Sequence, residues 1–145
     1  MSAPPSRGPI VVDTGVFGAE LVRRGAPIAN AYRPLLEGRP VIISWITAAE
    51  IRYGAALAGW GASRVQRLES RLERARIVWP GPELTDTYVE LRVKATRAGH
   101  GIAHKHHEAD RWIAATALWL GIPLAAHDGI FRNIAGLTLE HRSVP

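Results

Sequence analysis

Short apolar runs alternate along the chain with longer segments in which apolar residues recur every three or four positions. The first pattern is typical of buried parallel strands, and the second of helices that bury one face. The predicted strands cover residues 10–12, 41–45, 77–79, 123–126 and 137–139. The predicted helices cover residues 14–24, 27–38, 47–59, 62–75, 85–98 and 108–120. This alternation predicts one α/β domain with a parallel sheet flanked by helices on both faces.

Glycine and proline residues mark the expected ends of several elements. Gly25 is expected to close the first helix, and Gly121 to stop the last one, because glycine readily adopts the left-handed conformation found after helices. Pro34 lies inside the second helical segment. It lacks the N–H of an ordinary helical residue, so we expect it to kink that helix or to mark its true start.

The two ends of the chain set the expected domain boundaries. Residues 1–9 (MSAPPSRGP) are rich in proline and small residues, which predicts a flexible tail. The domain is expected to cover residues 10–140, and residues 141–145 form a C-terminal tail. No apolar run suits a signal peptide or a membrane span, so we expect a cytoplasmic protein without membrane contact.

Composition narrows the chemistry. The 145 residues carry a net charge of +5, and 16 of the 18 basic residues are arginine. Arginine pairs well with phosphate, so this balance suits an anionic polymer, although it could equally reflect genome composition. There is no cysteine, which excludes disulfides, thiolate metal sites and cysteine nucleophiles.

Four acidic residues fall at comparable points of the predicted fold. Asp13 ends the first strand, and Asp128 comes two residues after the fourth. Glu50 and Asp110 lie in the first turns of their helices. Sites in such folds lie beyond the carboxyl ends of the strands, so all four residues should share one rim of the sheet.

Carboxylates gathered at one rim repel one another unless a cation is present. Hard oxygen ligands without cysteine favour Mg²⁺ or Mn²⁺ over zinc. One or two such ions suit the attack of an activated water on a phosphodiester. The acidic residues therefore predict a metal-dependent nuclease site.

Each acid also has a purely structural interpretation, and these remain open. Asp13 could cap the following helix, and Asp110 could complement a helix dipole. Thr47 and Glu50 fit a capping box. Asp128 stands before a glycine in a typical turn sequence.

The ordered segments resemble the PIN-domain nucleases, and within them the VapC-type toxins of bacterial toxin–antitoxin pairs. The matching pieces are IVVDTGVF (10–17), ISWITAAEIRYGA (43–55), EADRWIAATALWLGIPLAAHDGIF (108–131) and NIAGLTLE (133–140). The resemblance implies a Rossmann-like sheet and a Mg²⁺- or Mn²⁺-dependent endoribonuclease. It also implies a homodimer or a toxin–antitoxin hetero-oligomer, and neutralisation by a VapB-like antitoxin.

The resemblance also assigns roles at the site. Asp13, Glu50, Asp110 and Asp128 match the four catalytic acids. Asp13, Asp110 and Asp128 are expected to hold the ion, and Glu50 to complete or orient its surroundings. Thr14 matches a hydroxyl that supports these ligands, and Glu108 is an auxiliary candidate.

The chain departs from the family pattern at three positions. Gly15 stands in place of a common serine, Ala109 in place of asparagine, and Ala126 in place of threonine. These changes remove hydrogen-bonding groups around the ligands. They bear on how tightly a metal would bind rather than on whether the site exists.

Basic and aromatic side chains elsewhere suggest RNA contacts, each with a simpler alternative. The predicted helix over 62–75 carries a band of four arginines that either contacts the RNA backbone or forms a solvated surface: Arg64, Arg67, Arg71 and Arg74. The histidine-rich segment 104–107 could contact phosphate, but a plain surface loop is the simpler interpretation. Among the tryptophans, Trp60 between two glycines is the one expected to be exposed.

The sequence thus predicts an endoribonuclease toxin that cleaves RNA phosphodiesters. Two alternatives remain. One is a catalytically idle module that binds RNA or an antitoxin. The other is a metal-dependent phosphohydrolase of the haloacid-dehalogenase type, which needs a second aspartate where this chain has Gly15.

Overall fold

Five parallel strands form the centre of the molecule, in the order β3-β2-β1-β4-β5. The computed structural model describes residues 7–145. The strands are β1 (Ile10–Val12), β2 (Val41–Ser44), β3 (Arg76–Val78), β4 (Leu124–Ala125) and β5 (Leu139–Glu140). The prediction of one α/β domain with a parallel sheet is confirmed.

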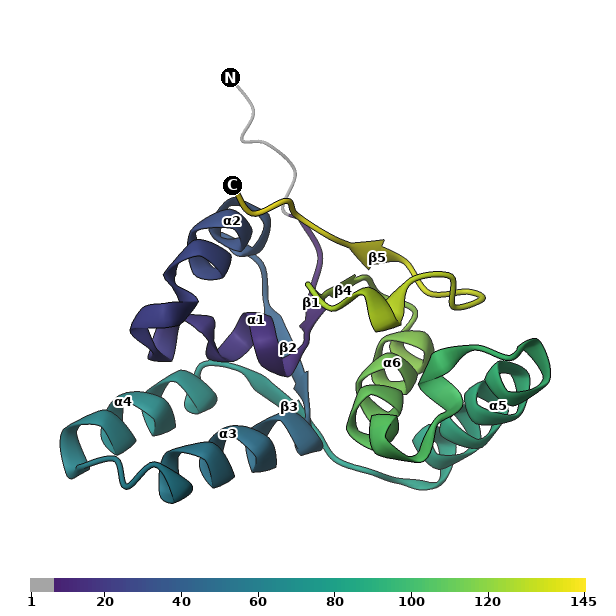
Figure 1. Ribbon diagram of the computed structural model, residues 1–145, viewed down its shortest axis with the longest axis horizontal. Coiled ribbons are helices and arrows are strands. Elements are labelled where there is room, and N and C mark those ends of the chain that lie inside the picture. The colour runs from purple at the N-terminus through teal and green to yellow at the C-terminus, as the bar shows by residue number, and fades with distance from the viewer. Residues whose placement is uncertain (1–6) are drawn as a thin grey trace.

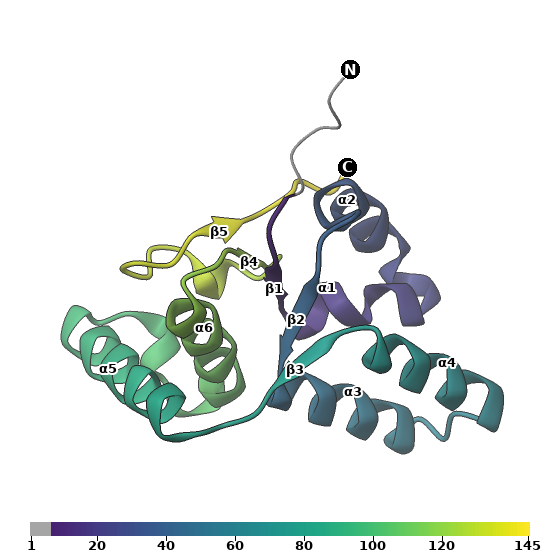
Figure 2. The same ribbon diagram turned by 180° about the vertical axis from the view of Figure 1, so that it is seen from behind.

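Helices cover both faces of this sheet, as Figures 1 and 2 show from opposite sides. The α-helices are α1 (Thr14–Gly18), α2 (Ala26–Leu36), α3 (Trp45–Leu57), α4 (Ala62–Glu73), α5 (Pro82–Ala98) and α6 (Glu108–Leu120). Short 3-10 turns join them: η1 (Ala19–Leu21), η2 (Arg23–Gly25), η3 (Gly101–Ala103), η4 (Lys105–His107) and η5 (Gly129–Phe131). Helices α1 to α4 gather on one side, and α5 with α6 on the other (Figure 1).

The central strand β1 separates two hydrophobic cores. Successive strand residues point to opposite faces, so Val11 packs with α5 and α6, whereas Ile10 and Val12 pack with α1 to α4. All three residues are fully buried. A strand that is covered on both faces needs a continuous apolar run, which explains the sequence Ile-Val-Val.

The register of the strands aligns their carboxyl ends. Val11 pairs with Ile42 and with Leu124, so Asp13, two residues further along, stands level with Ser44. Asp13 continues the pairing, since its N–H donates to the Ala125 carbonyl at 3.0 Å. The residues that follow β1, β2 and β4 therefore meet at one edge, as expected for a parallel sheet.

Helix α3 begins two residues earlier than predicted. Ser44 is its N-cap, and the Ser44 hydroxyl accepts from the Ile46 N–H at 3.3 Å. The predicted capping box with Thr47 as its first residue is wrong, because Thr47 already lies inside the helix. The capping role that the Thr47–Glu50 pattern suggested for Glu50 therefore does not apply.

The segment predicted as one helix over residues 14–24 breaks into three short pieces. The break falls at Val22, whose backbone is extended (φ −133°, ψ 145°). Helix α2 runs unbroken through Pro34, so the proline does not mark its start. The Pro34 carbonyl oxygen accepts a hydrogen bond from the Arg7 guanidinium at 2.8 Å.

The structure describes part of the predicted N-terminal tail and all of the predicted C-terminal tail, and both make contacts with the domain. Residues 1–6 of the predicted N-terminal tail lie outside the described part of the chain. Gly8 is held by Arg39, which donates to its carbonyl at 2.8 Å. His141 and Arg142, assigned to the C-terminal tail, contact His127 and Tyr32. No helix within residues 7–145 is long and apolar enough to span a membrane.

We expect Gly25→Ala to destabilise the fold. Gly25 has an ordinary negative φ of −83°, so its role is not to supply the left-handed conformation that a helix stop would use. A Cβ at this position would lie 2.1 Å from the Ala19 carbonyl oxygen, and relieving this clash requires the backbone to shift. The free energy of unfolding should fall by about 1–3 kcal/mol or more, measured by urea denaturation.

Gly54→Ala provides the matched control. Gly54 lies within α3, and a Cβ there meets no atom within 4 Å. Alanine should stabilise this helix by about 0.5–1 kcal/mol. Equal stability of the two variants would contradict the close approach of Gly25 to Ala19.

Candidate active site

Asp13 connects the central strand to the first helix. As the N-cap of α1, its Oδ1 accepts from the Val16 N–H at 2.8 Å. The structural interpretation of Asp13 as the cap of the following helix is therefore correct. However, Asp13 is only 5% exposed, and an ordinary cap does not need a buried carboxylate.

The surroundings of Asp13 favour its protonated form in the metal-free protein. Its pKa is raised from the ordinary 3.8 to about 7, mainly by burial and in addition by the negative charges of Asp110 and Asp128. The backbone N–H groups of Val16 and His127 act in the opposite direction. The three predicted metal ligands thus share one electrostatic environment, although they lie far apart in the sequence.

Asp110 lies in the first turn of α6, where its Oδ2 is 2.8 Å from His107 Nδ1. The loop that carries His107 is fixed by the adjacent Arg111, which is buried. The Arg111 guanidinium donates to the carbonyls of Ile102 and His104, and to the Tyr88 hydroxyl. The histidine-rich segment is therefore more than a surface loop, because one of its imidazoles orients a candidate ligand.

Asp128 is exposed and caps the short turn η5. Its Oδ1 accepts from the Ile130 N–H at 2.9 Å. Here too the structural interpretation holds, and it leaves the carboxylate close enough to raise the pKa of Asp13.

Glu50 is linked through Thr14 to the segment that follows Asp13. The Thr14 hydroxyl donates to Glu50 Oε1 at 2.8 Å, and it lies 3.1 Å from the hydroxyl of the buried Thr47. Thr14 and Glu50 line a hollow of about 770 Å³ between α3 and the segment that follows β1. Glu108 is exposed and has no polar contact among the described residues, so its auxiliary role stays a prediction.

The donor set fits a hard divalent cation. It consists of carboxylates at one rim, where an ion would offset the burial and the neighbouring charges that raise the pKa of Asp13. Within residues 7–145, no three acidic or histidine side chains are already placed closely enough to enclose an ion. Asp110 and Asp128 instead hydrogen-bond to His107 and to the Ile130 N–H.

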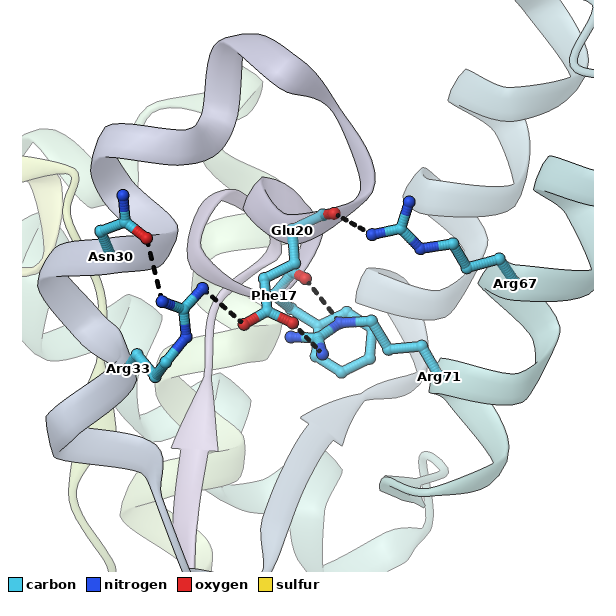
Figure 3. Close-up of polar contacts among 6 residues, drawn as sticks. All are labelled: Phe17, Glu20, Asn30, Arg33, Arg67 and Arg71. Atoms are coloured by element: carbon cyan, nitrogen blue, oxygen red, sulfur yellow. Dashed lines mark hydrogen bonds and ion pairs between the residues drawn. The ribbon is translucent and has the colours of Figure 1, made fainter.

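The arginines of α4 dock onto the protein itself, as Figure 3 shows for Arg67 and Arg71. Arg71 donates to the Phe17 carbonyl at 3.0 Å and to Glu20 Oε2 at 2.8 Å, while Arg67 donates to the Glu20 carbonyl. Arg64 donates to the Leu21 carbonyl. These bonds satisfy carbonyl oxygens at the end of α1 and in η1 that have no helical partner.

Arg74 bonds only within its own helix, to the Ser70 carbonyl. The four arginines are thus not the uniformly solvated surface of the simpler interpretation. Their contact with RNA stays a prediction, with Arg74 the least engaged of the four.

Two of the tryptophans also differ from expectation. The Trp60 ring packs against the core beside α3, and the Arg64 guanidinium lies 3.8 Å from its centroid. Trp79, expected to end the third strand, is 64% exposed instead. A tryptophan between two glycines was therefore a poor indicator of exposure.

The comparisons with known proteins agree with this geometry. The family model described as the PIN domain matches residues 10–137. Among solved structures, the chain is similar to a chain of FitAB bound to an IR36 DNA fragment. The identity is 29% and the TM-score 0.75, over 91% of this chain and 94% of that one.

Two further solved complexes are similar over most of their chains. For FitAcB from Neisseria gonorrhoeae, the identity is 30% and the TM-score 0.70, over 90% of this chain and 95% of that one. For VapBC-1 from nontypeable Haemophilus influenzae, the values are 25% and 0.71, over 92% and 97%. No curated protein matches the sequence.

Without divalent ions, the free energy of unfolding should fall as the pH rises through about 7. The folded-state pKa of Asp13 is raised to about 7 from 3.8, so the folded protein holds a proton that the unfolded chain has released. The stability that this proton contributes is complete below the unfolded pKa of Asp13, 3.8, and is lost above its folded pKa of about 7. It amounts to at most roughly 4 kcal/mol.

Urea denaturation in a chelator at about pH 5 and pH 8 measures the loss. Asp13→Asn should remove this part of the pH dependence and be more stable than the parent at about pH 8. Asp86→Asn, on the exposed face of α5, is the matched control and should keep it. An Asp13→Asn variant that keeps the pH dependence of the parent would mean that Asp13 is not the group responsible.

Proposed function

The chain belongs to the PIN-domain family, and we propose that it is a metal-dependent endoribonuclease acting as the toxin of a VapBC-type pair. The observation that carries this proposal is the buried carboxyl of Asp13, whose pKa is raised to about 7 beside Asp110 and Asp128. A buried carboxyl at the sheet edge lowers the stability of the fold when it ionises. Binding of a divalent cation would account for its presence there.

Asp13, Asp110 and Asp128 are the residues that would hold Mg²⁺ or Mn²⁺. When bound, such an ion lowers the pKa of the attacking water and neutralises charge on the phosphodiester oxygens. Asp13 would give up its proton on binding, so affinity should increase with pH. His107 keeps Asp110 oriented through their 2.8 Å contact.

Glu50 is proposed to act beside these three residues. Thr14 fixes its Oε1, and the remaining carboxylate oxygen is available to orient the attacking water or to accept its proton. Cleavage by water on this path leaves a 5′-phosphate and a 3′-hydroxyl, as the family resemblance implies.

The partners follow from charge and from the similar structures. A net charge of +5, carried almost wholly by arginine, suits an RNA substrate. The similar chains come from complexes named VapBC and FitAB, which supports a VapB-like antitoxin and a homodimer or toxin–antitoxin hetero-oligomer. We propose that the protein acts in the cytoplasm.

Asp110→Asn should abolish cleavage while the fold survives. The substitution keeps the shape of the side chain but removes a charge that an ion requires. We expect the rate of cutting of a mixed single-stranded RNA with Mn²⁺ to fall by more than about 100-fold. Denaturing gels of timed reactions measure the rate, and circular dichroism verifies folding.

Asp86→Asn, purified in parallel, controls for contaminating ribonuclease and for charge alone. It should cut like the parent, and excess chelator should stop both. Cleavage that persists in Asp110→Asn would refute the proposed site. A parent protein that binds RNA but cuts none with Mg²⁺ or Mn²⁺ would favour the idle binding module.

Expression of the chain alone should arrest bacterial growth, because the enzyme would degrade cellular RNA. Co-expression of a small protein encoded by the adjacent upstream reading frame should restore growth. The Asp110→Asn variant should be harmless but should still bind that protein. Growth arrest that is unchanged by Asp110→Asn would separate toxicity from the carboxylate site.

A further inference from the structure

Tyr32 lies in α2 and is fully buried, yet its hydroxyl contacts three polar groups from the far end of the chain. The hydroxyl donates to the Ala126 carbonyl at 3.0 Å and accepts from the Arg142 N–H at 3.0 Å. His127 Nδ1 lies 3.1 Å away. No sequence pattern pointed to this residue, since its partners are 94 to 110 positions away.

These contacts use the full bonding capacity of the hydroxyl. A tyrosine hydroxyl has one hydrogen to donate and two lone pairs that can accept. With the hydrogen directed at Ala126, both the Arg142 N–H and a protonated His127 Nδ1 can donate to the oxygen. The His127 ring also meets the Tyr32 ring edge-on, with centroids 5.7 Å apart and an angle of 88°.

The Ala126–His127 peptide group links Tyr32 to the candidate site. Its carbonyl oxygen accepts from Tyr32, and its N–H lowers the pKa of the Asp13 carboxyl. The Asp13 N–H donates to the carbonyl of the preceding residue, Ala125, at 3.0 Å, so Tyr32 and Asp13 bind neighbouring carbonyls of one segment. The residue after His127 is Asp128, so one clamped peptide adjoins two candidate ligands.

We propose that Tyr32 is a positioning residue that sets Asp13 and Asp128 for cation binding through the Ala126–His127 peptide. This role rests on the proposed function. Because Tyr32 is fully buried, it acts on the ligands without touching RNA.

Tyr32→Phe removes the hydroxyl and keeps the ring that packs against His127. We expect Mn²⁺ to bind about 10- to 100-fold more weakly, measured from free Mn²⁺ by electron paramagnetic resonance. In RNA cleavage at fixed Mn²⁺ concentration, kcat should fall while KM for RNA stays unchanged.

Thr116→Val is the matched control. The Thr116 hydroxyl is also buried and hydrogen-bonded, donating to the Trp112 carbonyl at 2.8 Å. Its removal should lower stability by a similar amount, about 1 kcal/mol, but leave Mn²⁺ affinity unchanged. Equal losses of affinity in both variants would mean that Tyr32 acts only by stabilising the fold, which overturns the proposal.

A measurement on the parent protein needs no substitution and serves if Tyr32→Phe does not fold. Titration with Mg²⁺ should shift the NMR signals of the His127 and Arg142 amides and of the Tyr32 hydroxyl proton. Signals that do not move while Mg²⁺ binds would overturn the positioning role.

Failure of the proposed function gives a different result. A parent protein that binds no Mn²⁺ overturns the metal-dependent nuclease and the role of Tyr32 together. If the parent protein binds Mn²⁺ and the Tyr32→Phe variant has the same Mn²⁺ affinity and the same kcat, only the role of Tyr32 is overturned.

Discussion

Burial of a carboxyl group at the end of the central strand is the constraint around which the rest of the site is arranged. Asp13 follows a strand that is covered on both faces, so it cannot reach bulk water as a surface acid would. Its charge must be met by N–H groups, by a proton or by a cation. Val16 and His127 supply the N–H groups, and they do not prevent the rise of its pKa to about 7.

The local roles of the acids and their proposed catalytic roles therefore coexist. Asp13 and Asp128 each cap a helical turn, and Asp110 lies in the first turn of α6 in contact with His107. A cap fixes one carboxylate oxygen and thereby the direction of the other. A structural function at the backbone is in this way a means of orienting ligands, rather than an alternative to a site.

Sequence alone predicted the features that depend on neighbours along the chain. Helix α6 was placed at its observed bounds because its apolar face is strong and Gly121 ends it in the left-handed conformation (φ 66°). The carboxyl-end rule predicted that Asp13, Asp110 and Asp128 share one rim, and the charges of Asp110 and Asp128 do raise the pKa of Asp13. Their role as metal ligands stays a prediction. Sequence did not predict the contacts of Tyr32 or the docking of Arg71 onto Phe17, because those depend on how distant elements pack.

The clamp between Tyr32 and Arg142 has a consequence for the timing of synthesis. Helix α2 leaves the ribosome early, whereas the β4 segment and Arg142 come more than ninety positions later. A nascent chain can build the α1–α4 half first, since domains begin to fold during translation. Asp128 and the partners of Tyr32 from the end of the chain therefore take their places only after the last strands have been made.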